Sequence, residues 1–125
     1  MRPKSDTLTG QELEIMKVIW PRGQATVREV YDELKERRTI AYTTVQTMMN
    51  ILETKGHLKK EPGEKAQTYA PVRPQQLVVR SMVREFVNRV FDGSARTLLV
   101  HLLNDKGLTE QERKQLQRLL DKEGH

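Results

Sequence analysis

Hydrophobic residues recur at helical spacing from the start of the chain, and the first run follows a helix-start signal. Thr9 with Glu12 three residues later is a capping-box pattern, in which side chains and backbone N–H groups at a helix start satisfy one another. The apolar positions behind it predict a helix over about residues 10–20. Pro21 and Gly23 are expected to end this helix, because proline breaks the backbone ladder and glycine favours the turn that follows.

A second capping-box pattern, Thr26 with Glu29, opens another amphipathic run, which ends in the charged residues 35–38. A third helical run follows and stops at Gly56, because glycine most readily adopts the left-handed conformation after a last helical turn. These runs predict a second and a third helix. Their apolar faces, which we expect to be buried, consist of Val27, Val30, Tyr31 and Leu34 in the second helix and Ala41, Val45, Met48, Met49 and Leu52 in the third.

The polar face of the third helix is unusual because it carries no charge. No residue from Thr39 to Leu52 is charged, although 31% of the whole chain is charged. A solvated helix face usually carries Glu and Lys, whereas short neutral groups that donate and accept hydrogen bonds suit base edges in a major groove. This pattern favours DNA recognition, with a partly buried protein interface as the alternative. The neutral face consists of Thr43, Gln46, Thr47, Asn50 and Thr54, with Tyr42 beside them.

Basic residues stand on both sides of this neutral stretch. Arg37 and Arg38 precede it, and Lys55, Lys59 and Lys60 follow it. Cations in these positions are predicted to contact two phosphate backbones while the neutral face lies between them.

After the third helix the apolar period changes from 3.6 residues towards two. Two short strands are predicted around the Pro62-Gly63 turn. Three helices followed by a basic hairpin are typical of a winged helix-turn-helix domain, here residues 1–72, in which the third helix enters the groove and the hairpin lies along the backbone. The lysines of the hairpin are predicted phosphate contacts, although lysines that protect an edge strand explain each of them equally well. These lysines are Lys59, Lys60 and Lys65.

Residues 73–125 return to helical spacing and predict three more helices: one that ends at Asp92, a short one over residues 95–103, and a last one opened by the capping-box pattern of Thr109 and Glu112. They carry more apolar surface than three short helices can bury. A second copy of the chain is the expected cover, because twofold homodimers are the commonest oligomers; folding back on the first domain is the alternative. The predicted dimer interface consists of Phe86, Val90, Phe91, Leu98, Leu99, Leu102, Leu103, Leu116, Leu119 and Leu120.

The composition narrows the class of partner. The 22 Lys and Arg residues exceed the 17 Asp and Glu residues, and the resulting charge of +5 favours a polyanion. One Trp, three Tyr and two Phe are too few for the stacking platforms that bind single strands, so duplex DNA is the better candidate.

The chain has no cysteine, which excludes disulfides and Cys-ligated zinc. Its first residues lack the apolar core of a signal peptide, so a cytoplasmic location without membrane insertion is expected.

Patterns for catalysis and metal binding are missing from the sequence. His57, His101 and His125 do not have metal-ligand spacing, and the serines lie in no nucleophile motif. His101 has apolar neighbours, which indicates a packed or interfacial residue. A chain of 125 residues also leaves little room for a large enzyme pocket. We therefore expect no enzymatic activity, no cofactor and no bound metal.

Four segments, LTGQELEIMKVIW, TVREVYDEL, AYTTVQTMMNILETKGHLKKE and QTYAPV, resemble the penicillinase-repressor family of BlaI, MecI and CopY type. The resemblance extends to the C-terminal LTEQERKQLQRLLDK and is most specific in YTTVQTMMNILETKGHL. It implies a dimeric winged-helix transcriptional repressor of antibiotic resistance genes, bound to inverted-repeat operators, often with TACA and TGTA half-sites. In the family the third helix reads the bases and the C-terminal helices form the dimer. The matching reading positions are Tyr42, Thr43, Thr44, Gln46 and Thr47.

Two departures from the family patterns limit what the resemblance implies about regulation. CopY-type copper sensors end in Cys-x-Cys pairs, so the lack of cysteine excludes copper sensing by that route. The β-lactamase repressors are cleaved between an Asn and a Phe in the helix that matches residues 95–103, where this chain has His101-Leu102. A sensor protease as a partner, with cleavage near this pair, therefore rests on the resemblance alone. A winged-helix module that binds another protein instead of DNA is the alternative function.

Overall fold

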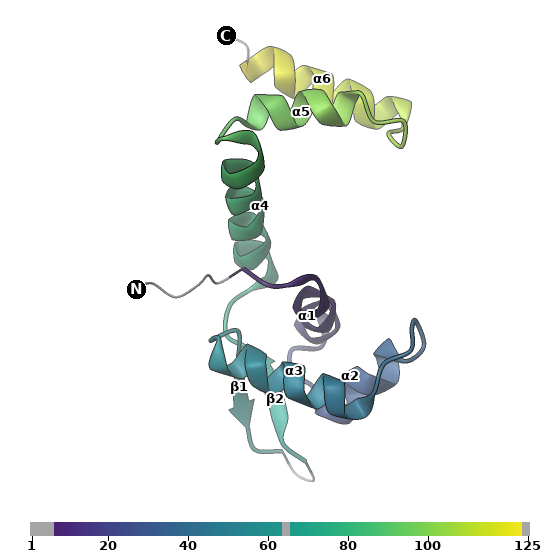
Figure 1. Cartoon of the computed structure of the whole chain (residues 1–125), viewed down its shortest axis with the longest axis vertical. Coiled ribbons are helices and arrows are strands. Elements are labelled where there is room, and N and C mark those ends of the chain that lie inside the picture. The colour runs from purple at the N-terminus through teal and green to yellow at the C-terminus, as the bar shows by residue number, and fades with distance from the viewer. Residues whose placement is uncertain (1–6, 64–65, 124–125) are drawn as a thin grey trace. The chain divides into compact units, whose positions relative to one another are not determined.

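The computed structural model describes residues 7–63 and 66–123, which form a mainly helical chain with one small hairpin, as predicted. The chain divides into two compact units, residues 1–80 and 81–125 (Figure 1). The described elements are α1 (Gly10–Arg22), α2 (Val27–Leu34), α3 (Tyr42–Thr54), β1 (Leu58–Glu61), β2 (Thr68–Pro71), α4 (Gln75–Phe91), α5 (Ala95–Leu103) and α6 (Glu110–Glu123).

Both predicted capping boxes of the N-terminal unit are present at the starts of α1 and α2. A cap of this kind typically stabilises a helix by about 1 kcal/mol, because it satisfies N–H groups that have no partner within the helix. The predicted end of α1 needs a correction, because the helix continues past Trp20 to Arg22 and contains Pro21. Proline in the last turn removes few backbone hydrogen bonds, and Gly23, with φ of 81°, ends the helix.

The core of the N-terminal unit lies between α1, α2 and α3. The predicted inner face of α3 is largely confirmed, because Val45, Met49 and Leu52 are fully buried and Met48 is half-buried. Ala41 is the exception: it is exposed and is the N-cap of α3, where the backbone has left the helical period. The rest of the buried core includes Ile15, Met16, Val18, Ile19, Val30, Leu34, Leu58 and Tyr69.

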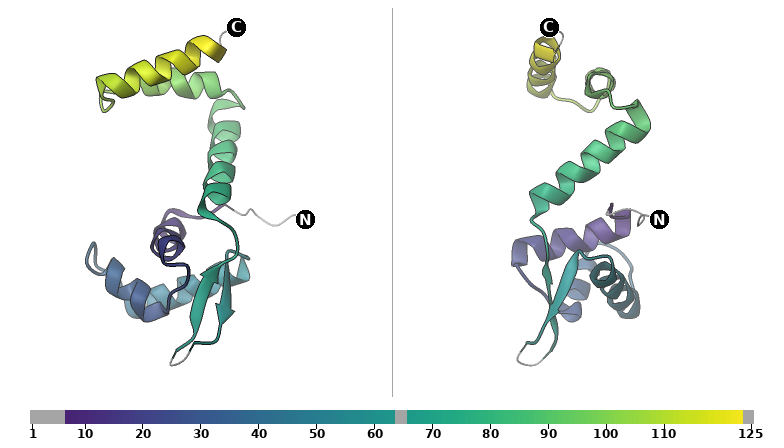
Figure 2. Two further views of the ribbon diagram at one scale, coloured as in Figure 1. Left: turned by 180° about the vertical axis from the view of Figure 1, so that it is seen from behind. Right: turned by 90° about the vertical axis from the view of Figure 1, so that its left-hand side faces the viewer.

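The hairpin begins directly after α3, where Gly56 has φ of 87°. β1 and β2 pair antiparallel, with Lys60 opposite Tyr69. Ala25, between α1 and α2, pairs with Tyr69 through two backbone hydrogen bonds of 3.0 and 2.8 Å, which attach the hairpin to the helices. The hairpin extends beyond the helices of its unit in the views of Figures 1 and 2, as a wing would.

The division between the two units falls at residues 80 and 81, inside α4, whereas the sequence placed a domain boundary at residue 72. The segment before α4 is tied to α1, because Trp20 Nε1 donates a hydrogen bond of 3.2 Å to the carbonyl oxygen of Arg73. Val78, in the first turns of α4, is buried. These contacts join two segments that are far apart in the sequence, so local periodicity did not indicate them.

The C-terminal unit contains the rest of α4 together with α5 and α6, whose predicted positions are confirmed. α4 ends before Asp92 and Gly93, which have φ of 52° and 85°. α5 and α6 lie side by side (Figures 1 and 2). The predicted capping box of Thr109 and Glu112 opens α6.

Candidate nucleic-acid interface

α3 presents a neutral, polar face to solvent. The packing that buries Val45 and Met49 turns the opposite side of the helix outward. The exposed side chains carry hydroxyl and amide groups that both donate and accept hydrogen bonds. This face is chemically suited to the edges of base pairs in a groove. Its exposed members include Thr43, Thr44, Gln46, Thr47 and Thr54.

Two predicted reading residues are already held by neighbours in the same unit. Asn50 Oδ1 accepts a hydrogen bond of 2.8 Å from the hydroxyl of Tyr69 in β2. The ring of Tyr42 meets that of Tyr31 edge to face, with centroids 5.6 Å apart, and the guanidinium of Arg28 lies 5.0 Å from its centroid. Both side chains are exposed, and each is held by a contact with another element of the unit.

Ile51 belongs to the same surface, although the sequence assigned it to neither face of the helix. Its side chain is 41% exposed and lines a shallow hollow together with Thr47, Asn50, Thr54 and Lys55. An exposed branched aliphatic residue in an otherwise polar face offers a methyl surface, which can contact the methyl group of thymine. The sequence could have assigned Ile51 to this surface, because Ile51 lies one helical turn after Thr47 and directly follows Asn50.

Each of the five described cations that the sequence predicted as phosphate contacts has a carboxylate partner. Most of these side chains remain partly exposed, and exposed ion pairs contribute little to stability. A phosphate can therefore compete for such a cation at small cost. Lys65, the sixth candidate, lies outside the described residues. The pairs are Arg37 with Glu33 at 2.8 Å, Arg38 with Glu14 at 3.1 Å, Lys55 with Glu12 at 2.7 Å, Lys59 with Glu61 at 3.7 Å and Lys60 with Glu53 at 3.6 Å.

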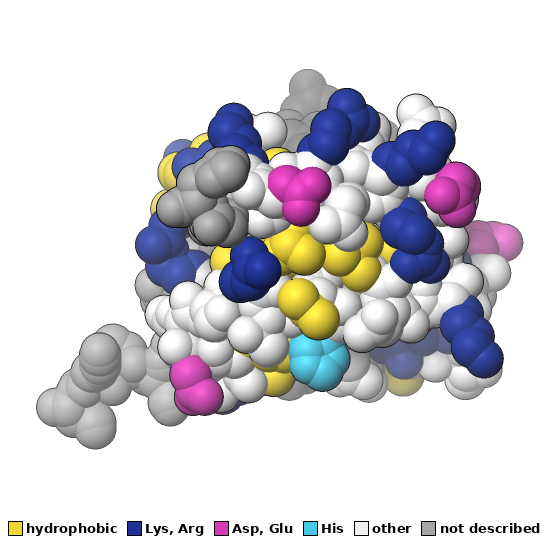
Figure 3. Space-filling view, turned by 90° about the horizontal axis from the view of Figure 1, so that it is seen from above, with side chains coloured by type: hydrophobic (Ala, Val, Ile, Leu, Met, Phe, Trp, Pro, Cys, Tyr) yellow, Lys and Arg dark blue, Asp and Glu magenta, His cyan; other side chains and the backbone are white. Residues whose placement is uncertain are grey.

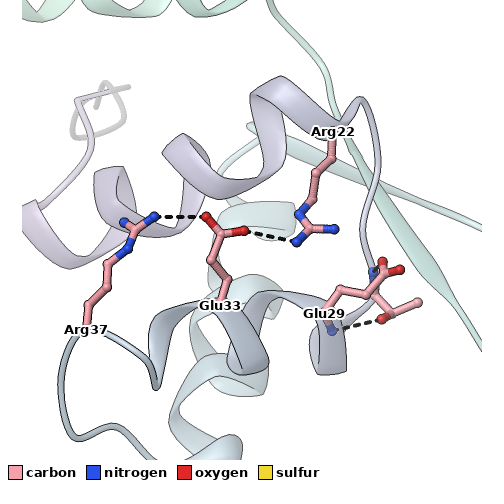
Figure 4. A network of polar contacts seen from close by, with 5 residues as sticks. Arg22, Glu29, Glu33 and Arg37 are labelled. Carbon is pink, nitrogen blue, oxygen red and sulfur yellow. Dashed lines mark hydrogen bonds and ion pairs between the residues drawn. The ribbon is translucent and has the colours of Figure 1, made fainter.

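Glu33 is shared between two arginines, as Figure 4 shows. One carboxylate oxygen contacts Arg37 at 2.8 Å, and the other contacts Arg22, at the end of α1, at 2.9 Å. The carboxylate therefore joins the end of α1 to the segment after α2. It also leaves a net single positive charge on the group of three side chains.

Lys55 differs from the other candidates because its partner is buried. The Glu12 side chain is only 6% exposed, and its Oε1 also accepts a hydrogen bond from the Thr9 backbone N–H. Burial would raise the pKa of Glu12, but the hydrogen bonds from Lys55 and Thr9 and the charge of Lys55 outweigh it, so the pKa lies below its ordinary value of 4.5. This pair fixes the end of α3 to the start of α1.

The Glu12 contact predicts an acid-dependent stability. A carboxylate with a lowered pKa stabilises the fold above its unfolded-state pKa, and the contribution is lost as the pH falls through the folded-state pKa. Glu12→Gln, which can retain the capping box, should lower the free energy of unfolding at neutral pH by on the order of 1 kcal/mol. Urea unfolding over a pH series should show the difference from wild type shrinking towards acid pH.

Glu36→Gln is the matched control, because Glu36 is exposed and takes part in none of the ion pairs found among the described residues. It makes the same change in net charge. A pH-independent loss in Glu12→Gln, or an equal loss in the control, would contradict the assigned role of the pair.

The predicted dimer residues differ in how far their own chain covers them. Phe86, Val90 and Leu119 are 41%, 49% and 52% exposed, whereas Leu120 is buried at 9% and so belongs to the packing within the chain. Figure 3 views the molecule from the side of α5 and α6 and shows hydrophobic side chains gathered in the middle with Lys and Arg around them. The half-buried members are Phe91, Leu98, Leu99, Leu102, Leu103 and Leu116.

His101 and Leu102 both lie inside α5. His101 is exposed, and its ring centroid lies 5.3 Å from that of Phe91. No cluster of metal-binding side chains occurs within residues 7–63 and 66–123. In the same part of the chain, no helix combines the length and apolar character needed to cross a membrane.

The family model of the penicillinase repressor matches residues 8–122. The chain belongs to the penicillinase repressor family. It is 28% identical over 118 residues to the penicillinase repressor of Bacillus licheniformis, which covers 94% of this chain and 92% of that protein. It is 35% identical over 101 residues to the transcriptional regulator BlaI of Mycobacterium tuberculosis, which covers 79% of this chain and 73% of that protein.

Two solved structures connect this penicillinase repressor family member to a known fold. The solution structure of the DNA-binding domain of the repressor BlaI matches with a TM-score of 0.52 and 32% identity, over 59% of this chain and 90% of that one. The monomeric form of Bacillus licheniformis BlaI, solved in complex with the blaP half-operator, matches with a TM-score of 0.50 and 32% identity, over 59% and 87% of the two chains. The predicted winged-helix fold and the family resemblance are confirmed.

Proposed function

We propose that this protein is a transcriptional repressor that binds operator DNA as a homodimer, with α3 in the major groove and the β1-β2 hairpin along the backbone. The observation that carries the proposal is the uncharged, hydrogen-bonding face of α3, which is exposed between basic residues. Membership of a family that includes repressors, and the half-operator bound by its relative BlaI, support the same function.

Base reading is assigned to the exposed side chains of α3. Hydroxyl groups can donate to or accept from base edges, and glutamine can form paired hydrogen bonds with adenine. Ile51 adds an apolar contact suited to thymine. Asn50 contributes mainly through its amide N–H groups, because its oxygen already accepts from Tyr69. The hydrogen-bonding set is Tyr42, Thr43, Thr44, Gln46, Thr47 and Asn50.

Phosphate binding is assigned to the cations around α3 and on the hairpin. Arg37 and Lys59 are the most exposed of the paired candidates, with 53% and 60% of their side chains accessible. Their carboxylate partners are exchanged for phosphate oxygens when DNA binds. Phosphate contacts of this kind fix the register of the protein on the duplex and carry no sequence information.

Dimerisation is assigned to residues 73–125, through the apolar side chains of α4 and α6 that their own chain leaves exposed. Two copies related by a twofold axis would present two α3 helices to the two halves of an inverted repeat.

We also propose that the segment around His101 and Leu102 is a regulatory region, where cleavage by a sensor protease would separate the dimer and release DNA. We propose a cytoplasmic location for the protein, in agreement with this function.

Salt dependence is the test of DNA binding. Affinity for a duplex should fall steeply between about 50 and 200 mM salt, because each phosphate contact releases counterions. The double variant Lys59→Ala, Lys60→Ala should weaken binding to all sequences and lower the slope of log K against log salt by roughly 2. Fluorescence anisotropy with a labelled duplex measures both quantities.

The double variant Lys106→Ala, Lys114→Ala is the charge control for this pair, because both lysines are exposed and lie in the C-terminal unit. Its salt slope should equal that of the wild type. If duplex binding by the wild type does not depend on salt, the proposed function is wrong. If it does, but the Lys59→Ala, Lys60→Ala variant keeps the wild-type slope, the hairpin does not contact the DNA backbone and the proposed function stands.

A further inference from the structure

We propose that Arg28 is an additional phosphate contact, held against Tyr42 at the edge of the α3 reading face. This inference rests on the proposed DNA-binding function and deepens it. Arg28 lies on α2, a different helix from the reading residues, and the sequence alone gave no reason to associate the two.

The position of Arg28 is set by two aromatic rings. Its Cζ lies 5.0 Å from the ring centroid of Tyr42 and 5.8 Å from that of Tyr31. The two rings meet edge to face, at 75°, and join α2 to α3. A guanidinium close to aromatic rings is attracted by their π electrons, so the rings direct the cation towards the start of α3.

The charge of Arg28 is less compensated than those of the other cations near α3. Its only ion pair among the described residues, between Nη1 and Asp32 Oδ1, is 3.9 Å long, and the two side chains are 65% and 49% exposed. Such a pair is weak in water. Arg37, by contrast, shares Glu33 with Arg22 at distances below 3 Å (Figure 4).

The chemistry of Arg28 and its place beside α3 indicate a phosphate ligand. Tyr42 is the first residue of α3, next to Thr43 and on the same surface as Gln46. When that surface lies in a groove, a cation at its edge meets the phosphates that line the groove. Guanidinium has donors in a planar fork that fit phosphate oxygens two at a time. The exposed guanidinium of Arg28 keeps most of these donors for such a ligand.

The distinguishing variant is Arg28→Gln, compared with Lys17→Gln. Lys17 is exposed on α1 and makes none of the ion pairs found in the described part of the chain, so it gives the same charge change elsewhere in the unit. Arg28→Gln should lose roughly tenfold in affinity at about 0.1 M salt, on specific and scrambled duplexes alike, and its salt slope should fall by roughly 1. Lys17→Gln should retain the wild-type slope.

Two results separate this inference from the proposed function. If the wild type shows no salt-dependent duplex binding, the function itself fails. If the wild type binds and Arg28→Gln keeps its slope, or if Lys17→Gln loses as much as Arg28→Gln, the assignment of Arg28 is wrong. Thermal unfolding of each variant, followed by circular dichroism, checks that the fold is intact.

Variants of Tyr42 test its positioning role. Tyr42→Phe keeps the ring that contacts Arg28, so its affinity for scrambled DNA and its salt slope should equal those of the wild type, whereas its affinity for the specific duplex should fall with the loss of the reading hydroxyl. Tyr42→Ala removes the ring and should weaken binding to specific and scrambled DNA together, with a lower salt slope. If Tyr42→Ala loses affinity only for the specific duplex and keeps the wild-type salt slope, Tyr42 reads a base but does not hold Arg28.

Discussion

Replacing Thr43, Gln46 or Thr47 by alanine is expected to weaken binding to the specific operator by about 1–3 kcal/mol per substitution, while binding to scrambled DNA changes little. The reason is that these uncharged side chains contribute to base contacts and not to phosphate contacts. Competition titrations against the tightest duplex selected from a random pool, and against a scrambled duplex, measure the two affinities. The ratio of the affinities, and not either value alone, reports base reading.

Gln11→Ala is a matched control for Gln46→Ala. Gln11 is an exposed glutamine on α1, a different helix from the reading residues, and its loss should leave both affinities unchanged. Equal losses on specific and scrambled DNA in the α3 variants would mean that these side chains do not read bases. The neutral face would then be better explained as a protein interface.

The second large effect is expected at the dimer contact. Phe86→Ala and Leu119→Ala remove side chains that are 41% and 52% exposed in the single chain, so neither should greatly destabilise the fold. If these side chains are buried against a second copy, their truncation typically costs about 2–5 kcal/mol, which raises the dimer dissociation constant roughly 30-fold or more. Analytical ultracentrifugation over a concentration series measures that constant.

Loss of the dimer should in turn weaken operator binding. Two linked half-site binders gain affinity through effective concentration, so the dimer variants should lose far more affinity for a full inverted repeat than for a half-site. Val72→Ala truncates an equally exposed residue, 48% accessible, in the N-terminal unit and should leave both affinities unchanged. Variants that remain dimeric, or that bind the full operator as tightly as the wild type, would contradict the assignment of dimerisation to α4 and α6.

The sequence by itself determined the helices and most of their ends. Capping boxes at Thr9, Thr26 and Thr109, and glycine after α3 and α4, act within a few residues, so the sequence pattern contains the whole interaction. The same holds for the exposed neutral face of α3, because helical periodicity separates Val45 from Thr43 and Gln46. The continuation of α1 through Pro21 departed from the pattern, because a proline in a last turn disrupts little of the ladder.

Only the tertiary structure decided which of the candidate site residues are free to act. Asn50 is held by Tyr69, Lys55 by Glu12, and Arg28 is placed beside Tyr42. Each of these contacts joins different elements of the chain, and their partners are set by the packing of α1, α2, α3 and the hairpin around a shared core. Hydrophobic periodicity specifies which side of each element faces that core, but it does not specify which polar groups meet across it. The sequence therefore showed which charged residues lie near α3, but it did not show which carboxylates form ion pairs with them.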